Sequence, residues 1–396
     1  MSGSFSFWLG LVCFFLLVTQ VPATFILLSR LIKGAFRHPP LLPANCTPDL
    51  VGKVSVVVPT LNEVERIDPC LEGLHRQTEE VREILIVDSN SQDGTRERVQ
   101  QMTQKDSRFQ LLTDNPLPNG WVGRPWALNY GFWRTSTESE WFLGIDADTQ
   151  PQPGLVASLV KAAESEGYDL LSLSPQFILQ SVGEWWLQPA LLMTLLYRFD
   201  SAGVRDQAPE RVMANGQCFL CRRSVLEKLD GYKIAAGSFC DDVTLARYVA
   251  QQGYRVGFFD GAKVIRVRMY EGMAETWKEW GRSLDLKDAS SVAQLWGDVI
   301  LLTLVQGLPL VLIILLELCS NLSYGFLTLK IAIFLNLLLV TIRFALLIAV
   351  YPSYYRAKKS LATLSFWFSP FADPVAVVRI ILSALQKPKQ WRGRVY

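Results

Sequence analysis

Phe142-Leu143-Gly144-Ile145-Asp146-Ala147-Asp148-Thr149 is an apolar run that leads directly into two carboxylates one residue apart. Such a run is typical of a buried parallel strand, which carries functional side chains to the carboxyl edge of a sheet. Alternate residues of an extended backbone point the same way, so Asp146 and Asp148 can face one ligand together. Carboxylate oxygens beside a diphosphate suit Mg²⁺ or Mn²⁺. The alternative is a solvated turn after a strand, and the surrounding motifs weigh against it.

Two earlier apolar segments are each followed by a polar loop. Lys53-Val54-Ser55-Val56-Val57-Val58-Pro59 is a predicted buried strand, and Thr60-Leu61-Asn62-Glu63 is the loop after it. Residues 83–87 are a second predicted strand, which ends in the polar turn Asp88-Ser89-Asn90-Ser91-Gln92-Asp93-Gly94-Thr95. Predicted helices separate these strands. The alternation predicts an α/β fold with a mostly parallel, Rossmann-like sheet flanked by helices and with ligands at the carboxyl ends of the strands.

A glycine-containing loop with one cation precedes the strand at residues 141–145. It reads Asn119-Gly120-Trp121-Val122-Gly123-Arg124-Pro125-Trp126-Ala127-Leu128-Asn129 and leads into a predicted helix. Arg124 could bind a diphosphate through charge-assisted hydrogen bonds. An exposed loop arginine without that role is the alternative.

The composition indicates a membrane-anchored protein with one soluble domain. Half of the 396 residues are hydrophobic and the net charge is +2, which excludes disorder and gives no electrostatic case for nucleic acid. The single Cys218-x-x-Cys221 has no second pair, so we expect buried reduced thiols rather than a zinc site. Apolar residues gather at the two ends. We therefore divide the chain into an amino-terminal anchor (1–37), a soluble domain (38–290) and a carboxyl-terminal membrane region (291–396).

The charges that flank the apolar segments predict the topology. Residues 7–28 are uncharged and are followed by basic side chains, so we expect an uncleaved anchor with its amino terminus outside. Residues 295–318 and 326–350 are two predicted spans that form a hairpin, since Arg356, Lys358 and Lys359 follow the second. Residues 361–385 contain Pro370, Asp373, Pro374 and Arg379, which favours an interfacial or re-entrant segment. The soluble domain and the carboxyl terminus would then be cytoplasmic.

One further apolar segment, residues 177–199, has two interpretations. It contains Glu184, Pro189 and the pair Trp185-Trp186, which a spanning helix would tolerate poorly. The segment is therefore either a helix that lies in the membrane interface or an ordinary core helix.

Four segments occur in one order and together resemble the family 2 glycosyltransferases. They are Val56 to Glu63, Val87 to Thr95, Asp146-Ala147-Asp148, and Phe239-Cys240-Asp241-Asp242-Val243-Thr244-Leu245-Ala246-Arg247. Family members are inverting enzymes with the A-type nucleotide-sugar-binding fold. The resemblance therefore implies a nucleotide-sugar donor, UDP- or GDP-linked, and a divalent cation, Mg²⁺ or Mn²⁺.

The resemblance also implies a role for each matching residue. Pro59, Thr60, Glu63, Asp88, Arg124 and Asp146 would bind the nucleotide sugar, Asp148 and Asp146 the metal, and Gly216, Gln217 and Asp241 would line the acceptor side, with Asp242 as the catalytic base. Two positions depart from the family pattern. Ser89 follows Asp88 where a second aspartate is usual, and no Gln-x-x-Arg-Trp motif of the processive synthases is recognisable. The second departure favours transfer of one sugar over polymer synthesis.

Membrane segments beside such a domain favour a lipid-like acceptor. Two segments resemble the carotenoid- and hopanoid-associated branch, and most of all the carotenoid (myxol) 2'-O-glycosyltransferases. They are Gly120-Trp121-Val122-Gly123-Arg124-Pro125-Trp126-Ala127-Leu128 and the tail from Ser369-Pro370-Phe371-Ala372-Asp373-Pro374 through Trp391-Arg392-Gly393-Arg394. Glycolipid synthases that act on diacylglycerol, ceramide, hopanoid or polyprenyl phosphate are the alternative enzymes. A catalytically inactive nucleotide-sugar-binding membrane protein is the non-enzyme alternative, against which the joint presence of Asp146, Asp148 and Asp242 argues.

Overall fold

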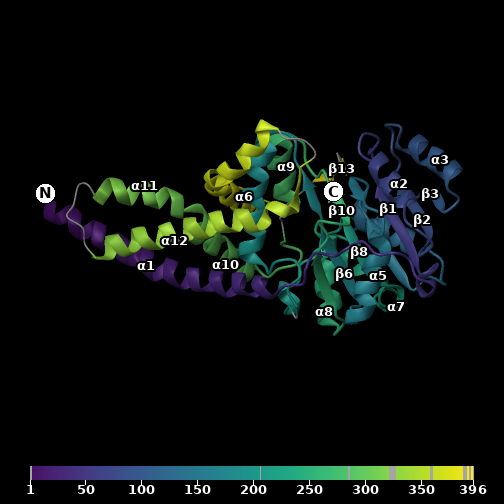
Figure 1. The fold of residues 1–396 in the computed structure, drawn as a ribbon, viewed down its shortest axis with the longest axis horizontal. Coiled ribbons are helices and arrows are strands. Elements are labelled where there is room, and N and C mark those ends of the chain that lie inside the picture. Colours follow the sequence, from purple (N-terminus) through teal and green to yellow (C-terminus); the bar gives the residue numbers. More distant parts are fainter. Residues whose placement is uncertain are drawn as a thin grey trace.

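The computed structural model describes residues 2–205, 207–283, 286–320, 327–356, 360–386, 390–391 and 394–395. The molecule is elongated, with an α/β domain at one end and long helices at the other (Figure 1). The long helices α1 (Ser2–Lys33), α11 (Pro309–Ser320) and α12 (Leu327–Val350) extend away from the sheet. The amino terminus lies at the far end of this helical part.

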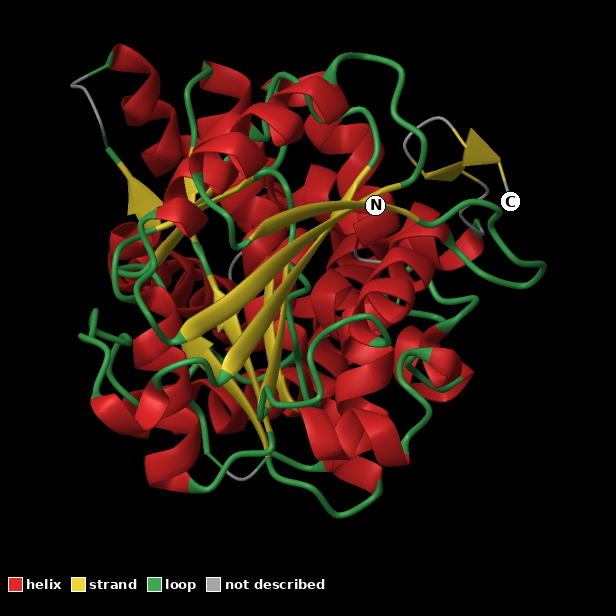
Figure 2. Cartoon of the chain, turned by 90° about the vertical axis from the view of Figure 1, so that its right-hand side faces the viewer, coloured by secondary structure: helices red, strands yellow, loops and turns green. Residues whose placement is uncertain are grey.

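The α/β domain is built on a seven-stranded sheet with the order β3-β2-β1-β4-β8-β6-β9. All its pairings are parallel except those of β8, which runs antiparallel to both β4 and β6. Figure 2 shows the twisted sheet enclosed by helices. The prediction of a mostly parallel α/β sheet is confirmed. The strands are β1 (Val54–Thr60), β2 (Val81–Asp88), β3 (Phe109–Thr113), β4 (Trp141–Ile145), β6 (Leu170–Ser174), β8 (Cys218–Arg222) and β9 (Val256–Asp260).

Strand β1 is apolar along its length because both of its faces are covered. Val54, Val56 and Val58 belong to the core beneath α2 (Asp68–His75), α3 (Thr95–Lys105) and α5 (Leu155–Glu166). Val57 points to the opposite core, which α4 (Gly123–Phe132), α7 (Arg223–Lys228) and α8 (Asp241–Gln251) complete. A Cβ on Gly131 of α4 would lie 2.5 Å from Val57 Cγ1, so a glycine allows that helix to approach the sheet.

Strand β8 also accounts for the Cys-x-x-Cys pair. Cys218 lies in the first of these two cores and Cys221 in the second, because residues three apart on a strand face opposite sides. Burial raises the pKa of both thiols above the ordinary value. The pair is therefore part of the sheet's packing.

A second, four-stranded sheet joins the domain to the membrane helices. Its order is β11 (Tyr354–Tyr355), β7 (Gln176–Ile178), β10 (Ile265–Val267) and β5 (Thr149–Pro151). Strand β11 follows α12 after the turn η6 (Tyr351–Ser353), and it pairs with β7 of the domain. The remaining short elements are η1 (Gly34–Phe36), η2 (Pro48–Leu50), η3 (Pro209–Arg211), η4 (Lys233–Ala235), β12 (Gln390–Trp391) and β13 (Arg394–Val395).

The tryptophan-containing segment after residue 177 is a core helix. Helix α6 (Val182–Arg198) packs against η7 (Leu361–Ala372), α9 (Gly272–Ser283) and α13 (Asp373–Leu385). Trp185 and Gln188 are buried within it, and Gln188 Nε2 donates to Thr276 Oγ1 of α9 at 3.0 Å. The core interpretation therefore holds, since the polar side chains that exclude a spanning helix find partners inside the protein.

In the part of the chain that the structure describes, three helical segments are long and apolar enough to cross a membrane: Phe7–Phe36, Leu327–Ser353 and Leu361–Leu385. The predicted single span at residues 295–318 is instead a bent pair. Helix α10 (Val292–Leu302) continues into the π-helical turn η5 (Thr303–Gly307), and α11 leaves it at an angle, with a 52° bend between Val292–Gly307 and Pro309–Cys319. Pro309 lacks the N–H that a continuous helix would need, which accounts for the break. Lys358 and Lys359 lie outside the described residues, and the orientation in the membrane stays a prediction.

A buried ion pair ties these apolar segments together. Arg343 of α12 donates from Nε to Asp373 Oδ2 at 2.8 Å and from Nη2 to Asp373 Oδ1 at 3.0 Å. Ser369 Oγ and Gln306 Nε2 complete the network. The geometry is the two-pronged fork that guanidinium and carboxylate groups favour. Asp373, which argued against a span at residues 361–385, is thus paired within the protein.

Arg343→Met should destabilise the protein by about 3–5 kcal/mol, because it leaves a buried carboxylate without its cation. The double variant Arg343→Met/Asp373→Leu should be markedly more stable than the single one. Unfolding of the purified protein in detergent measures both, with Arg98→Gln, whose side chain is half exposed, as the matched control. Equal stability of Arg343→Met and wild type would show that the pair contributes nothing.

Candidate functional site

A cavity of about 690 Å³ lies where β1 and β4 end and reaches toward α6, α9 and the end of α12. The side chains predicted for the site enter it from loops after these strands and from the start of α8. The lining includes Pro59, Glu63, Arg124, Asp146, Asp148, Gly216, Gln217, Asp241 and Asp242. These residues, far apart in the sequence, therefore meet in one place.

Arg124 connects the carboxylates of this cavity. Its Nε donates to Asp146 Oδ1 at 2.8 Å, and its Nη1 donates to Asp241 Oδ2. Its Nη2 donates to the carbonyl oxygen of Gly216 at 2.8 Å. Burial lowers the pKa of the Arg124 guanidinium, but the negative charges of Asp146, Asp241 and Asp242 together raise it by more than burial lowers it. The pKa therefore lies well above its ordinary value. Arg124 is therefore a fixed positive charge between the two carboxylate motifs.

Asp242 is held by backbone groups. Its Oδ2 accepts from the Gly216 N–H at 2.6 Å, and its Oδ1 accepts from the Val243 N–H at 2.8 Å. Burial raises the pKa of Asp242 above its ordinary value, and Arg124 offsets part of that effect. Burial likewise raises the pKa of Asp241 to about 6. A carboxylate with a raised pKa is a better proton acceptor than an exposed one.

Two predicted residues lie behind the cavity and are not among its lining. Thr60 and Asp88, at the ends of β1 and β2, are both buried. Asp88 Oδ2 accepts from Arg96 Nη1 at 2.9 Å and from the Ser91 N–H at 3.0 Å, and Thr60 Oγ1 donates to Asp88 Oδ1 at 3.3 Å. A contact between Asp88 and a nucleobase would require these bonds to be exchanged, so that role stays a prediction.

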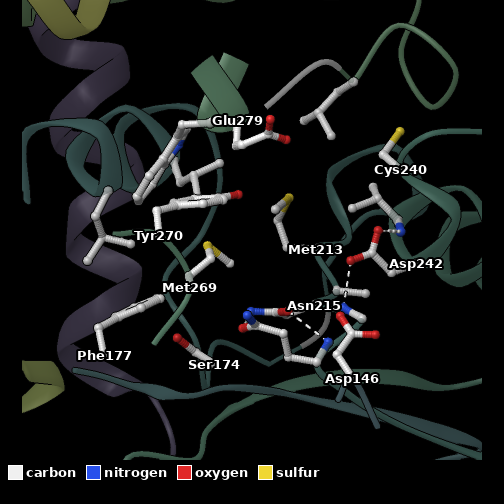
Figure 3. Close-up of a pocket in the computed structure, with 18 of the residues that line it drawn as sticks. Asp146, Ser174, Phe177, Met213, Asn215, Cys240, Asp242, Met269, Tyr270 and Glu279 are labelled. Carbon is white, nitrogen blue, oxygen red and sulfur yellow. Dashed lines mark hydrogen bonds between the residues drawn. The ribbon is translucent and has the colours of Figure 1, made fainter. Parts of the chain in front are cut away.

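The sequence did not point to two parts of this cavity. One is an ion pair across its edge, in which Arg66 Nη2 donates to Glu275 Oε1 of α9 at 3.1 Å. The other is an apolar wall opposite the carboxylates. Figure 3 shows Asp146 and Asp242 on one side, Phe177, Met269 and Tyr270 on the other, and Met213 and Asn215 between them. The wall also includes Leu192, Leu195, Leu196, Phe199, Trp280 and Val350.

The donors available for a metal are few. Among the residues that the structure describes, no three His, Cys, Asp or Glu side chains converge where they could hold an ion. Asp146 and Asp148 line the cavity together, and one Asp146 oxygen accepts from Arg124. Mg²⁺ and Mn²⁺ commonly bind through one or two carboxylates, with substrate phosphates and water as the other ligands. The donor set fits a divalent cation that arrives with a diphosphate.

Comparison with known proteins identifies the domain. Residues 55–230 match the family model described as "Glycosyl transferase family 2". This part of the chain is similar to glycosyltransferase family 2. The mannosyltransferase PcManGT of Pyrobaculum calidifontis, solved with GDP-Man and Mn²⁺, shares its fold, with a TM-score of 0.54, 17% identity and coverage of 95% of this chain and 98% of that one.

Two curated proteins are similar to this chain in sequence. A probable glycosyltransferase of Bacillus subtilis, YdaM, is 25% identical over 69% of this chain and 64% of its own length. The 4,4'-diaponeurosporenoate glycosyltransferase of Staphylococcus haemolyticus is 25% identical over 63% of this chain and 65% of its own length. The chain thus spans just under two thirds of each relative.

Gly216→Ala should disrupt the cavity around Arg124 with little effect on the fold, because an added Cβ would lie 2.2 Å from Arg124 Nη2. We expect binding of the nucleotide sugar to weaken at least about tenfold, since a displacement of one charged hydrogen bond costs about 1.5–3 kcal/mol. Calorimetric titration with UDP- and GDP-sugars measures the change in affinity. Gly297→Ala serves as a control on a glycine of α10 with open space around it. Unchanged affinity in Gly216→Ala would show that Arg124 need not hold its observed position.

Proposed function

We propose that this protein is an inverting, non-processive glycosyltransferase. It transfers one sugar from a UDP- or GDP-linked donor to a hydroxyl of a membrane-embedded, lipid-like acceptor, with a carotenoid such as myxol as the best candidate. The observation that carries the proposal is the cavity itself, in which the carboxylate end is continuous with an apolar wall made by α6, by Phe177 and Met269, and by the end of α12. A soluble sugar acceptor would have no use for that wall.

The donor end of the cavity supports the first half of the proposal. Glu63, Asp146, Asp148 and Arg124 would bind the nucleotide sugar, and Asp148 with Asp146 would hold Mg²⁺ or Mn²⁺. Such a cation would neutralise the charge that grows on the leaving diphosphate. Arg124 would share that task, since its guanidinium is fixed beside Asp146 at 2.8 Å. PcManGT, which has the same fold, was solved with GDP-Man and Mn²⁺, in keeping with this assignment.

Asp242 would act as the general base. The acceptor hydroxyl loses its proton to Asp242 as the hydroxyl oxygen attacks the anomeric carbon, and the bond to the diphosphate breaks on the opposite face. This in-line displacement inverts the anomeric configuration. The backbone N–H groups of Gly216 and Val243 fix both Asp242 oxygens, which orients the carboxylate for that transfer.

The apolar wall and the helices predicted to span the membrane support the second half of the proposal, which is transfer to a lipid-like acceptor. Tyr354 and Val350, at the point where α12 meets the second sheet, place the membrane part next to the cavity. An acceptor could enter from the bilayer with its hydroxyl toward Asp242 and its chain against α6 and α9. The relative named for 4,4'-diaponeurosporenoate makes carotenoids the first acceptors to test. The topology that we propose places the domain on the cytoplasmic face.

The test is turnover by the purified protein in detergent with a panel of UDP- and GDP-sugars. Myxol and other hydroxylated carotenoids, diacylglycerol, ceramide, a hopanoid and polyprenyl phosphate serve as acceptors, and product analysis reports both linkage and anomeric configuration. We expect one sugar per acceptor with inverted configuration. Release of the nucleotide without any glycosylated lipid, for every donor that binds, would contradict the proposal and favour a binding protein.

Asp242→Asn should lower kcat by about 10²-fold or more, because the amide keeps the shape of the carboxylate but cannot take up a proton. The affinity for the nucleotide sugar should hardly change. Asp241→Asn, which alters the neighbouring carboxylate, is the matched control and should reduce kcat less. A near-normal kcat in Asp242→Asn would show that another group is the base.

Asp148→Ala should abolish transfer while the protein stays folded and inserted, because the cation would lose a carboxylate ligand. EDTA should have the same effect on wild type, and Mn²⁺ or Mg²⁺ should restore activity. Glu72→Ala, which removes a half-exposed carboxylate on α2 outside the cavity, provides the comparison. Full activity in EDTA would rule out metal dependence.

A further inference from the structure

Basic side chains gather where α1 meets the α/β domain, away from the carboxylates of the donor site. We call this group the basic cluster; it consists of Arg30, Lys33, Arg198, Arg211 and Arg247. The carboxylates beside it, among the described residues, are Asp200, Asp298 and Glu210. The positive charges therefore outnumber the negative ones in a region that is mostly shielded from water.

Three ion pairs of the basic cluster are longer than ordinary charge-assisted hydrogen bonds. Arg30 Nη1 lies 3.6 Å from Asp298 Oδ1, and Lys33 Nζ lies 3.7 Å from Asp200 Oδ2. Arg211 Nη2 lies 3.4 Å from Asp200 Oδ1. Charge-assisted hydrogen bonds are usually 2.7–2.9 Å long. The carboxylates thus balance part of the charge without forming the tight forks that guanidinium groups make, as Arg343 does with Asp373.

Arg247 has an unused donor in the protein interior. The side chain is 3% exposed, its Nε donates to the Val212 carbonyl at 3.1 Å, and its Nη1 donates to Ser290 Oγ at 3.0 Å. Its Nη2 is buried with no hydrogen-bond partner. The guanidinium groups of Arg198 and Arg247 both lie over the ring of Phe199, at 4.9 and 5.6 Å. A buried charged N–H without an acceptor is costly, which calls for an anion.

The position of the basic cluster indicates which anion. Helix α1 is uncharged from Phe7 to Ser29, and Arg30 is its first charged residue. The end of such an apolar stretch lies at the level of the lipid headgroups. Lys33 is half exposed and Arg211 is 22% exposed at the side chain, so the cluster is open to the surroundings on one side. Basic pockets between helices at this level suit lipid phosphates.

We propose that the basic cluster binds a phosphate group, supplied by the headgroup of an acidic phospholipid. A phosphate has several acceptor oxygens, so it can satisfy Arg247 Nη2 and pair with Arg211 and Lys33 at the same time. Asp200 belongs both to the cluster's ion pairs and to the lining of the large cavity. The bound headgroup therefore lies next to the entrance that the proposed acceptor would use, and it anchors the domain against the bilayer.

The experiment uses the full chain, purified and stripped of lipid in a neutral detergent. Its thermal unfolding is followed while mixed micelles of phosphatidylglycerol, mixed micelles of phosphatidylcholine, or inorganic phosphate are added. The variants are Arg247→Gln, Arg211→Gln and Lys33→Gln; the last two change exposed side chains and keep the fold even if Arg247→Gln does not. Arg98→Gln removes a half-exposed charge on α3 and is the control.

We expect phosphatidylglycerol to raise the unfolding temperature of wild type and of Arg98→Gln, and phosphatidylcholine to have a smaller effect. Arg211→Gln and Lys33→Gln should each need about fivefold more phosphatidylglycerol, the change that corresponds to about 1 kcal/mol per basic side chain near a lipid surface. Stabilisation by inorganic phosphate as well would show that the site takes the phosphate group itself. Stabilisation that is the same in the variants as in wild type, or no stabilisation by either anion, would overturn the proposal.

Discussion

The guanidinium of Arg124 is shared among groups from three separate segments, and the organisation of the cavity depends on it. It bonds Asp146 at the end of β4, Asp241 at the start of α8 and the carbonyl of Gly216. Without that positive charge, buried carboxylates at this spacing would repel one another and take up protons. Gly216 in turn donates to Asp242, so one arginine positions both the proposed diphosphate site and the proposed base.

The cavity joins two environments that serve different substrates. At one end, charged groups are fixed by hydrogen bonds and suit a hydrophilic nucleotide sugar. At the other end, side chains of α6 form an apolar wall with Phe177 and Met269 beside the end of α12. A reaction between a water-soluble donor and a lipid-like acceptor needs both environments within reach of one base. Helix α6 packs inside the protein and its Gln188 is bonded to α9, which fixes the apolar end of the cavity relative to the charged end.

Buried charged side chains are arranged in two different ways in the helical part of the molecule. Arg343 and Asp373 satisfy each other in a tight fork, with Ser369 and Gln306 as further partners. This arrangement holds α12 against α13. The basic cluster near the end of α1 has loose pairs and an unused donor on Arg247. The first network pairs its positive and negative charges within the protein, although Arg343 Nη1 is buried without a hydrogen-bond partner, whereas the second has an excess of positive charge that suits an external anion.

The sequence alone determined the α/β class and the positions of the first four strands along the chain, because these depend on local patterns; the resemblance to a known family pointed to most of the residues that meet in the cavity. Apolar runs such as Val54–Pro59 show burial on both faces, and a carboxylate after such a run must lie at the sheet edge. Only the tertiary structure decided that β8 inserts antiparallel between β4 and β6, that Arg124 reaches Asp241 across 117 residues, and that α6 is a core helix. These features depend on contacts between distant segments, and no local periodicity encodes which segments come together.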